Sequence, residues 1–540
     1  MTADNLEATA RKLRRRWFAL AVMCVSIAVL AMDTTIVNVA VPAIQEDLAA
    51  SASSMQWIID AYYLVFAGLL LTMGALGDRW GRRLVLQIGM VCFAGASLFA
   101  AFAQSSEQLI LARALTGIGA ATVTPATLSI IVDTFPRHER ARAIAIWSAA
   151  AGIGVPLGQI AAGALLARFS WGSIFFITVP VCTLVFIGSL AAVSESRDPQ
   201  ARPIDPVGAL LSTLMLSSLV FGIIEAPSRG WTDAVVAGAI VLSVALALAF
   251  VAYELRTRIP MLDVRLLENP ALSISGVALI VVFLVMLGMM FLLTQYLQLA
   301  RGHSALETGL LMSPLPLGFA VGSGTSERAA VSFGSNRVTA LGLALAAAAL
   351  AALSLIGIGT GLWIIEVVLL VFGLGGGAVM APATAMMMES VPETVAGVGG
   401  ALNEATRVIG MALGVSVLGS ISNAVFASRM DDGGIARGLP ATAHLDSLAA
   451  AMQVSAHAGG PLGASVGAAA QAAFMDSFST AMMVGAALAL IAAPLILRWM
   501  PSTVTTHAPH APQAALDEVH IAPSARSAEF WAANISRRIG

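Results

Sequence analysis

Charged side chains are scarce in this sequence: Asp, Glu, Lys and Arg make up only 11% of its 540 residues, whereas hydrophobic residues make up 58%. A soluble protein typically has about 25% charged and about 45–50% apolar residues. A water-soluble fold of this composition would leave large apolar patches exposed. We therefore expect much of the surface to be solvated by lipid.

Cysteine is also rare, and Cys24, Cys92 and Cys182 each lie within an apolar run. Their spacing matches neither a metal site nor a disulfide framework. The net charge of −2 gives no basic field for nucleic acid. No Walker A loop, paired nucleophile and base, or metal cluster is found. We expect no enzyme activity, no cofactor, no metal and no nucleic-acid partner.

The apolar residues are grouped into long runs. A helix needs roughly 20 apolar residues to cross the hydrocarbon core of a bilayer. The first run follows basic residues 11–16 but continues to about residue 41, so it predicts a retained helix and not a cleaved signal peptide. We predict fourteen spans, near residues 17–42, 55–75, 84–104, 108–132, 141–166, 171–193, 207–226, 232–254, 271–298, 306–327, 337–358, 362–388, 396–425 and 477–500.

The basic residues of the loops alternate in number from one side to the other. Only Arg168, Arg229, Arg301, Arg429 and Arg437 fall in loops on one side. The other side receives Arg11, Lys12, Arg14, Arg15, Arg16, Arg79, Arg82, Arg83, Arg137, Arg140, Arg142, Arg197, Arg202, Arg256, Arg258, Arg265, Arg328, Arg337 and Arg498. Cytoplasmic loops carry the excess of Lys and Arg, so both termini are predicted to be cytoplasmic, in an inner-membrane protein.

Asp33 lies near the middle of the first span. An ionised carboxylate there costs several kcal/mol unless a partner neutralises it. A bound proton or a bound cation would each remove that cost, and only one can do so at a time. This competition is the basis of cation/proton exchange. The alternative is a structural polar group, with Thr34, Thr35 and Asn38 as its hydrogen-bond partners.

Arg113 lies within the fourth span and must face a partner or a water-filled space. We expect it to pair with a carboxylate; the alternative is a structural tie to backbone carbonyls. Asp33 and Arg113 are the candidate proton and cation coupling residues.

A short glycine-rich charged loop follows the second span, and we interpret it as a gate element, with a plain topology signal as the alternative. Its glycines allow a sharp turn, and its acid and arginines can form a network between helices. The candidate gate residues are Gly74, Gly77, Asp78, Arg79, Gly81, Arg82 and Arg83. A degraded copy, 333–337, follows the tenth span and indicates two repeated halves.

The fifth span has small residues every four positions, at Gly154, Gly158 and Ala162, with Gly163 beside the last. Such a smooth face favours close contact with another helix, and Pro156 would bend the span. Plain helix packing is the alternative to a functional role.

Further acids lie within or at the ends of the spans. We place Asp60, Tyr62, Glu225, Glu404 and Arg407 in a candidate substrate cavity, with Glu366 as a further acid near an outer end. Five acids against two arginines give a net negative interior, which would favour cationic ligands. Alternatively, Glu404 and Arg407 pair with each other at i,i+3, and Glu225 and Glu366 sit at wetted helix ends.

Several of these motifs resemble those of the major facilitator superfamily. Residues 74–83 look like its signature loop. Residues 33–42 resemble the first-span motif of its fourteen-span drug/proton antiporter branch. Arg113 with Gly117 and Gly119 resembles its fourth-span motif, with Thr116 in place of the usual Gln. The resemblance, over roughly residues 15–500, implies an all-α fold of two pseudo-symmetric six-helix bundles plus two inserted helices. Asp33 would then carry the proton or cation and Arg113 would be its coupling partner.

The implied organisation divides the chain into five parts. These are a cytoplasmic segment (1–16), a first bundle (17–193), two inserted helices with their loops (194–270), a second bundle (271–500) with an outer loop at 428–476, and a cytoplasmic tail expected to be disordered (501–540).

One position departs from the branch. Its fifth-span motif has a proline where this chain has Gln159, and Pro156 lies three residues earlier. This difference leaves the coupling and the direction of transport open.

The resemblance predicts a proton-driven exporter of lipophilic, cationic drugs such as quaternary ammonium compounds, dyes and antibiotics, acting by alternating access. The segment 57–62, which contains Asp60, is similar to the corresponding segment of members that export quaternary ammonium compounds and dyes. The expected partners are lipophilic small molecules, protons and the bilayer, and the chain is expected to be a monomer. An exporter of one endogenous metabolite and a non-transporting sensor remain alternatives.

Overall fold

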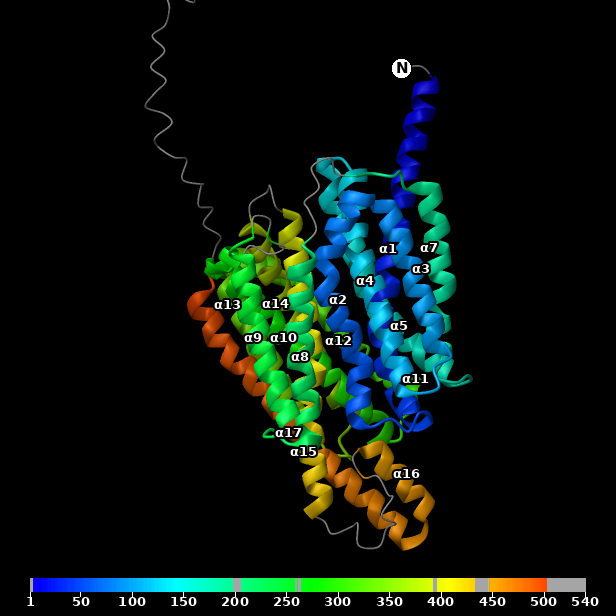
Figure 1. Ribbon diagram of the computed structural model, residues 1–540, viewed down its shortest axis with the longest axis vertical. Helices are drawn as coiled ribbons and strands as arrows, with labels where there is room; N and C mark the ends of the chain where they lie inside the picture. Colours follow the sequence, from blue (N-terminus) through cyan, green and yellow to red (C-terminus); the bar gives the residue numbers. More distant parts are fainter. Residues whose placement is uncertain are drawn as a thin grey trace, which may run out of the picture. The chain divides into compact units, whose positions relative to one another are not determined.

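The computed structural model describes residues 3–197, 205–257, 260, 264–391, 396–432, 445 and 447–502. Within these ranges the regular structure is helical (Figure 1). The tail expected to be disordered lies outside the described residues beyond residue 502, as does most of the connection from 433 to 446.

Helices α1 to α7 form a group that we call the first bundle. They are α1 (Ala3–Asp47), α2 (Ala52–Trp80), α3 (Arg82–Ala101), α4 (Ser106–Thr134), α5 (Arg137–Leu166), α6 (Ser173–Phe176) and α7 (Thr178–Ala192). Within it α1 packs on α5, α2 on α4, and α3 on both α4 and α7. Two further helices, α8 (Pro206–Arg229) and α9 (Ala234–Glu254), pack on each other, and α8 also contacts α2 and α15.

The second bundle comprises the helices from α10 onward. They are α10 (Pro270–Gln295) with the π-helical turn η2 (Tyr296–Ala300), α11 (Ala305–Leu311), α12 (Pro314–Phe333), α13 (Ser335–Ser354), α14 (Leu362–Glu389), α15 (Ala396–Asp432), α16 (Leu448–Ala458) and α17 (Gly460–Trp499). The short 3₁₀ helix η1 (Val264–Glu268) precedes them. Here α10 packs on α15, α12 on α14, and α13 on α14 and α17.

The described residues contain thirteen helices that are long and apolar enough to cross a membrane. Helix α2 adds a fourteenth if its parts 52–70 and 72–80, which meet at 54°, are counted as one span. The prediction of fourteen spans in an all-α protein is therefore confirmed. The predicted boundaries differ most at the last span: α17 begins at Gly460 and not near residue 477, because the alanine-rich stretch before the apolar run also favours helix.

Local sequence explains where the helices begin. The side chains of Ser51 and Ser105 accept the first free backbone N–H groups of α2 and α4, and Asp205 does so for α8. Ser304 and Glu307 form a reciprocal capping box at the start of α11.

Two of the connections on the proximal side, where α2 meets α3, are single glycines. Gly81 joins α2 to α3 with φ +121°, and Gly334 joins α12 to α13 with φ +90°. Both values favour glycine, because a Cβ atom would clash with the backbone. The same connection thus occurs at both copies of the repeated loop that the sequence indicates.

Because the helices alternate in direction, the loops gather at two faces. We call the face where α1 ends and α2 begins the distal face; it lies toward the bottom of Figure 1, with α11 and α16. The opposite face, where α2 meets α3, is the proximal face. Arg168, Arg229, Arg301 and Arg429 fall at the distal ends of their helices.

Candidate functional site

Asp33 and Arg113 form a buried ion pair between α1 and α4. One guanidinium nitrogen of Arg113 lies 2.7 Å from the Asp33 Oδ2 atom, and the two side chains are 2% and 0% exposed. The sequence expectation that Arg113 pairs with a carboxylate matches this geometry. The Nε group of Arg113 also donates to the Ile58 carbonyl at 3.3 Å, so the backbone tie is present as well.

The ring of Tyr62, on α2, lies next to the Arg113 guanidinium of this pair. The Arg113 guanidinium carbon is 4.6 Å from the ring centroid, which is cation–π distance. Tyr62 is fully buried, and within the described part of the chain its hydroxyl has no hydrogen-bond partner. Tyr62 therefore contributes its ring to the Asp33–Arg113 site, where the sequence had placed it in a substrate cavity.

The polar residues near Asp33 bond elsewhere. Thr34 donates to the Ala31 carbonyl, and the Asn38 amide donates to the Thr34 carbonyl. Thr35 donates to carbonyls of both α1 and α5. The alternative in which these side chains satisfy Asp33 does not hold here, because each bonds to a backbone oxygen of its own or the neighbouring helix.

Asp60 lies on α2 at the contact with α15. Its Oδ2 atom accepts a 2.6 Å hydrogen bond from the Ser416 hydroxyl, and the side chain is fully buried. Its Oδ1 atom has no hydrogen-bond partner among the described residues. Asp60 therefore does not line an open cavity in this conformation; it lies inside the contact between the bundles.

The remaining acids of the predicted cavity have basic partners. Glu404 and Arg407 pair at 2.8 Å on α15, and Glu225 and Arg229 pair at 3.0 Å on α8. Glu366 is half-buried near the distal start of α14. Three of the five acids, Asp33, Glu225 and Glu404, are therefore paired with an arginine, and a cation that binds one of these three has to displace that arginine.

The glycines of α5 allow backbone contact with α1. A Cβ atom on Gly154 would lie 2.4 Å from the Ala28 carbonyl oxygen, and one on Gly158 would lie 2.4 Å from the Thr35 hydroxyl. Pro156 lies between them, inside the helix. The small face of the fifth span thus packs on α1 next to the helix turn that carries Asp33.

Gly163 contacts the other bundle. A Cβ atom there would lie 2.3 Å from the Leu306 Cα atom of α11. Gln159, one turn earlier, meets α11 as well: its carbonyl oxygen lies 2.8 Å from the position of a Cβ atom on Gly309.

Hydrogen bonds from glutamine amides to backbone carbonyls also join the bundles toward the distal face. The Gln56 amide donates to the Val415 carbonyl at 3.1 Å, and the Gln298 amide donates to the Val39 carbonyl at 2.8 Å. Sequence reasoning missed these glutamines, because an isolated glutamine in an apolar run has no spacing signal.

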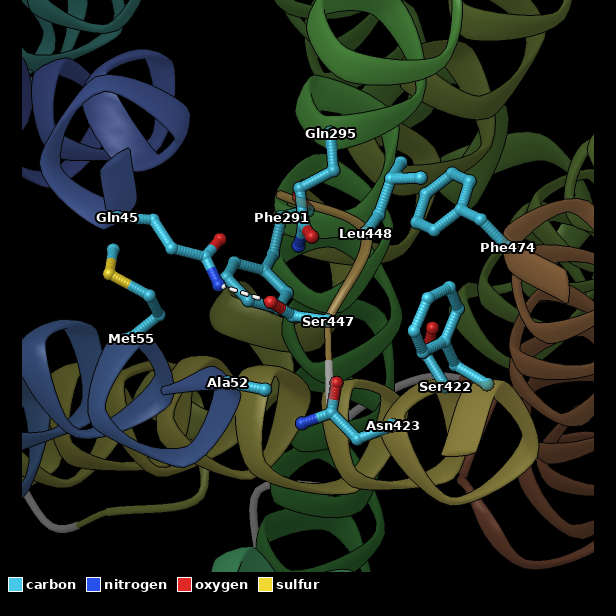
Figure 2. Close-up of a pocket in the computed structure, with 11 residues that line it drawn as sticks. Gln45, Ala52, Met55, Phe291, Gln295, Ser422, Asn423, Ser447, Leu448 and Phe474 are labelled. Atoms are coloured by element: carbon cyan, nitrogen blue, oxygen red, sulfur yellow. Dashed lines mark hydrogen bonds between the residues drawn. The ribbon is translucent and has the colours of Figure 1, made fainter. Parts of the chain in front are cut away.

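At the distal end of α1, Gln45 donates to the Ser447 hydroxyl at 2.9 Å, immediately before α16 (Figure 2). The surrounding pocket is lined from both bundles, by Gln45, Ala52, Met55, Phe291, Gln295, Ser422, Asn423, Phe426, Ser447, Leu448 and Phe474. These contacts close the distal side of the interface between the bundles.

The gate loop forms a charge network within the first bundle. Arg82 contacts Asp78 at 3.0 Å and Asp133 of α4 at 3.7 Å. Glu195, after α7, lies 3.7 Å from Arg83 and accepts the backbone N–H groups of Arg83 and Leu84 at the start of α3. Asp133 and Glu195 are members that the sequence did not reveal, since they lie far away along the chain.

The other candidate gate residues support this connection. Gly81 makes it possible, because a Cβ atom at this residue would lie 2.5 Å from a Glu195 carboxylate oxygen. A Cβ atom on Gly77 or Gly74 would lie 3.7 Å from Val85 or 3.5 Å from Pro125, which is ordinary contact, so the packing does not require glycine at these two positions. Arg79 lies in the last turn of α2.

Comparisons with known proteins agree with this architecture. The family model described as Major Facilitator Superfamily matches residues 23–415. The chain is 33% identical over 497 residues to the multidrug efflux pump LfrA of Mycolicibacterium smegmatis, covering 91% of this chain and 98% of that protein. It is 31% identical to the tetracenomycin C resistance and export protein of Streptomyces glaucescens, covering 77% of each.

A solved structure shares the fold. A bacterial homologue of the human lysosomal transporter Spinster, in an inward-facing and unoccupied conformation, superposes with a TM-score of 0.64 at 17% identity, covering 91% of this chain and 99% of that one. The fold, the multiple membrane-spanning helices and the relatives that are efflux pumps identify a multi-pass membrane transporter and not an enzyme. The chain belongs to the Major Facilitator Superfamily.

Proposed function

We propose that this protein is a proton-coupled antiporter that exports lipophilic, cationic drugs by alternating access. The observation that carries the proposal is the buried Asp33–Arg113 pair. An isolated buried charge is costly, so the Asp33 carboxylate needs a partner in every conformation. Arg113, a proton and a cationic substrate are three exclusive ways to supply one.

The conformation described here fits one stage of such a cycle. The distal side is closed by contacts between the bundles, and Asp33 is bound to Arg113. A cation that arrives from the proximal side competes with Arg113. Opening of the distal side then allows a proton to replace the cation, and the return of the proton-loaded protein releases the proton on the proximal side, where Arg113 pairs with Asp33 again.

The proximal face is proposed to be cytoplasmic and the chain to reside in the cell membrane. The arginines at the proximal ends of the helices outnumber those at the distal ends, and cytoplasmic loops carry such an excess. An inward proton then releases about 2.3 kcal/mol per 100 mV of membrane potential, in addition to any pH gradient. The protons enter as the coupling ion, and a monomer contains the complete pathway.

The experiment that tests the proposal is ethidium efflux from energised cells, with and without a protonophore. Asp33→Asn removes the titratable group and keeps the size of the side chain. Glu46→Gln, which removes an exposed acid near the end of the same helix, is the matched control. We expect efflux from wild type and Glu46→Gln that stops with the protonophore, and none from well-expressed Asp33→Asn. Undiminished proton-dependent efflux by Asp33→Asn would refute the assignment.

A second candidate is export of one endogenous compound. A relative whose name specifies a single compound, tetracenomycin C, favours it. If a well-expressed wild type exports neither ethidium nor other lipophilic cations, a narrow exporter with the same fold becomes the better interpretation.

A further inference from the structure

The chain contains a second carboxylate–arginine pair in the second bundle, and it differs from the first in exposure. Glu404 and Arg407 are one turn apart on α15, and their side chains are 22% and 24% exposed. Asp33 and Arg113 are 0% and 2% exposed. A molecule that enters between the bundles can therefore reach the Glu404 pair without first breaking the Asp33 pair.

The Glu404–Arg407 pair lies on the proximal side of the distal contacts. Ser416, which binds Asp60, follows Arg407 by nine residues on the same helix, about 14 Å at 1.5 Å per residue. A ligand that comes from the proximal side thus meets Glu404 before it meets the closed distal contacts.

The pair lies between an aromatic ring and the first bundle. The Arg407 guanidinium carbon lies 4.9 Å from the centroid of the Phe283 ring on α10. One turn before Glu404, a Cβ atom on Gly400 would lie 3.9 Å from the Leu128 side chain of α4. Residues four apart share one face of a helix, so Glu404 lies on the side of α15 that faces the first bundle. Arg407 has a second, aromatic partner that remains when the carboxylate is taken by another cation.

We propose that Arg407 is a built-in competitor that occupies Glu404 when no substrate is bound, and that Glu404 takes the positive centre of a lipophilic cation after Arg407 is displaced onto Phe283. This proposal rests on the proposed export of cations and adds an earlier step to it: Glu404 recognises the substrate first, and the cation and the proton then compete at Asp33.

The competition has a measurable consequence. A site that is free for only a fraction of the time binds its ligand more weakly by that fraction. If the pair is closed about nine-tenths of the time, removal of the arginine should strengthen cation binding by about tenfold. The same change should leave the binding of a neutral ligand nearly unaltered, because an uncharged molecule gains nothing from a free carboxylate.

The test uses the purified full-length protein in nanodiscs and radiolabelled tetraphenylphosphonium as the probe, without a proton gradient. Triphenylphosphine oxide, an uncharged molecule with similar rings, serves as a competitor. The variants are Arg407→Met, Arg407→Lys and Glu404→Gln/Arg407→Met. Arg429→Met is the matched control, since it removes a positive charge from the same helix but at a 3.0 Å pair with Asp476 near the distal end.

We expect the dissociation constant of tetraphenylphosphonium to fall about tenfold in Arg407→Met, and to remain near the wild-type value in Arg407→Lys and Arg429→Met. The gain should disappear in Glu404→Gln/Arg407→Met, and the affinity for triphenylphosphine oxide should not change. An unchanged or weaker affinity in a folded Arg407→Met protein would overturn the proposal, as would a gain that persists without Glu404. Proton coupling is tested separately by Asp33→Asn, so a gain in binding without proton-dependent efflux would support this inference and refute the proposed function.

Discussion

Replacement of Gln159 by methionine should shift the protein toward the conformation that is closed on the distal side. Gln159 is 1% exposed and lies where α5 meets α11 of the other bundle. Within the described part of the chain, neither its Oε1 nor its Nε2 atom has a hydrogen-bond partner. Closure of this contact therefore buries an amide that water would hydrate when the bundles separate.

The magnitude follows from the cost of that burial. A buried polar group without a partner costs about 1–3 kcal/mol. Methionine has nearly the same length and shape but no amide, so Gln159→Met should favour the closed state by about 1–3 kcal/mol. At 1.4 kcal/mol per factor of ten, the ratio of closed to open molecules should increase by a factor between about 5 and about 100. Thr308→Val should act in the same direction, because the Thr308 hydroxyl of α11 is likewise buried without a partner among the described residues.

The assay is double electron–electron resonance between spin labels at the distal ends of the two bundles. Cysteines that replace the exposed residues Glu107 and Gly359 carry the labels, in a background without the three native cysteines. Gln87→Met is the control, because the Gln87 amide is also buried but donates to Ser189 within the first bundle.

We expect the long-distance population to shrink in Gln159→Met and to stay unchanged in Gln87→Met. An unchanged population in Gln159→Met would refute the reasoning, because it would mean that the amide is equally well solvated in both states. An equal shift in both variants would do so as well, since Gln87 does not lie between the bundles.

Three further substitutions test the contacts around the site. Gly158→Ala should lower the free energy of unfolding of the purified protein by at least about 1 kcal/mol, because its Cβ atom would overlap the Thr35 hydroxyl. Gly152→Ala, where a Cβ atom would have no neighbour within 4 Å, should leave it unchanged, and equal effects would contradict the close packing at Gly158. Glu195→Ala should lower stability by about 1 kcal/mol, since it removes the acceptor of two backbone N–H groups at the start of α3, and a melting temperature equal to that of wild type would argue against this cap. Asp60→Asn should reduce efflux of cationic dyes more than efflux of neutral drugs, and equal losses would show that Asp60 serves only the contact with α15.

The sequence alone was sufficient to predict the class of protein and its spans. An apolar run of about 20 residues matches the thickness of the bilayer, and a helix satisfies its backbone hydrogen bonds within the same run. Both requirements can therefore be recognised from a local stretch of sequence. An intramembrane Asp33 and an intramembrane Arg113 are each conspicuous for the same reason: their isolated charges would be too costly in lipid. The chemistry that demands a partner could therefore be predicted before the partner was known.

The tertiary structure decided which partners each polar group finds. Arg113 is 80 positions from Asp33, and Ser416 is 356 positions from Asp60. The sequence placed Asp60 and Glu404 together in a candidate cavity, with a Glu404–Arg407 pair as the alternative; the fold buries Asp60 against a serine and forms the alternative pair at Glu404. A count of charges cannot distinguish these outcomes, because the energy of a charge in a membrane protein depends on distances between helices that only the packed bundles define.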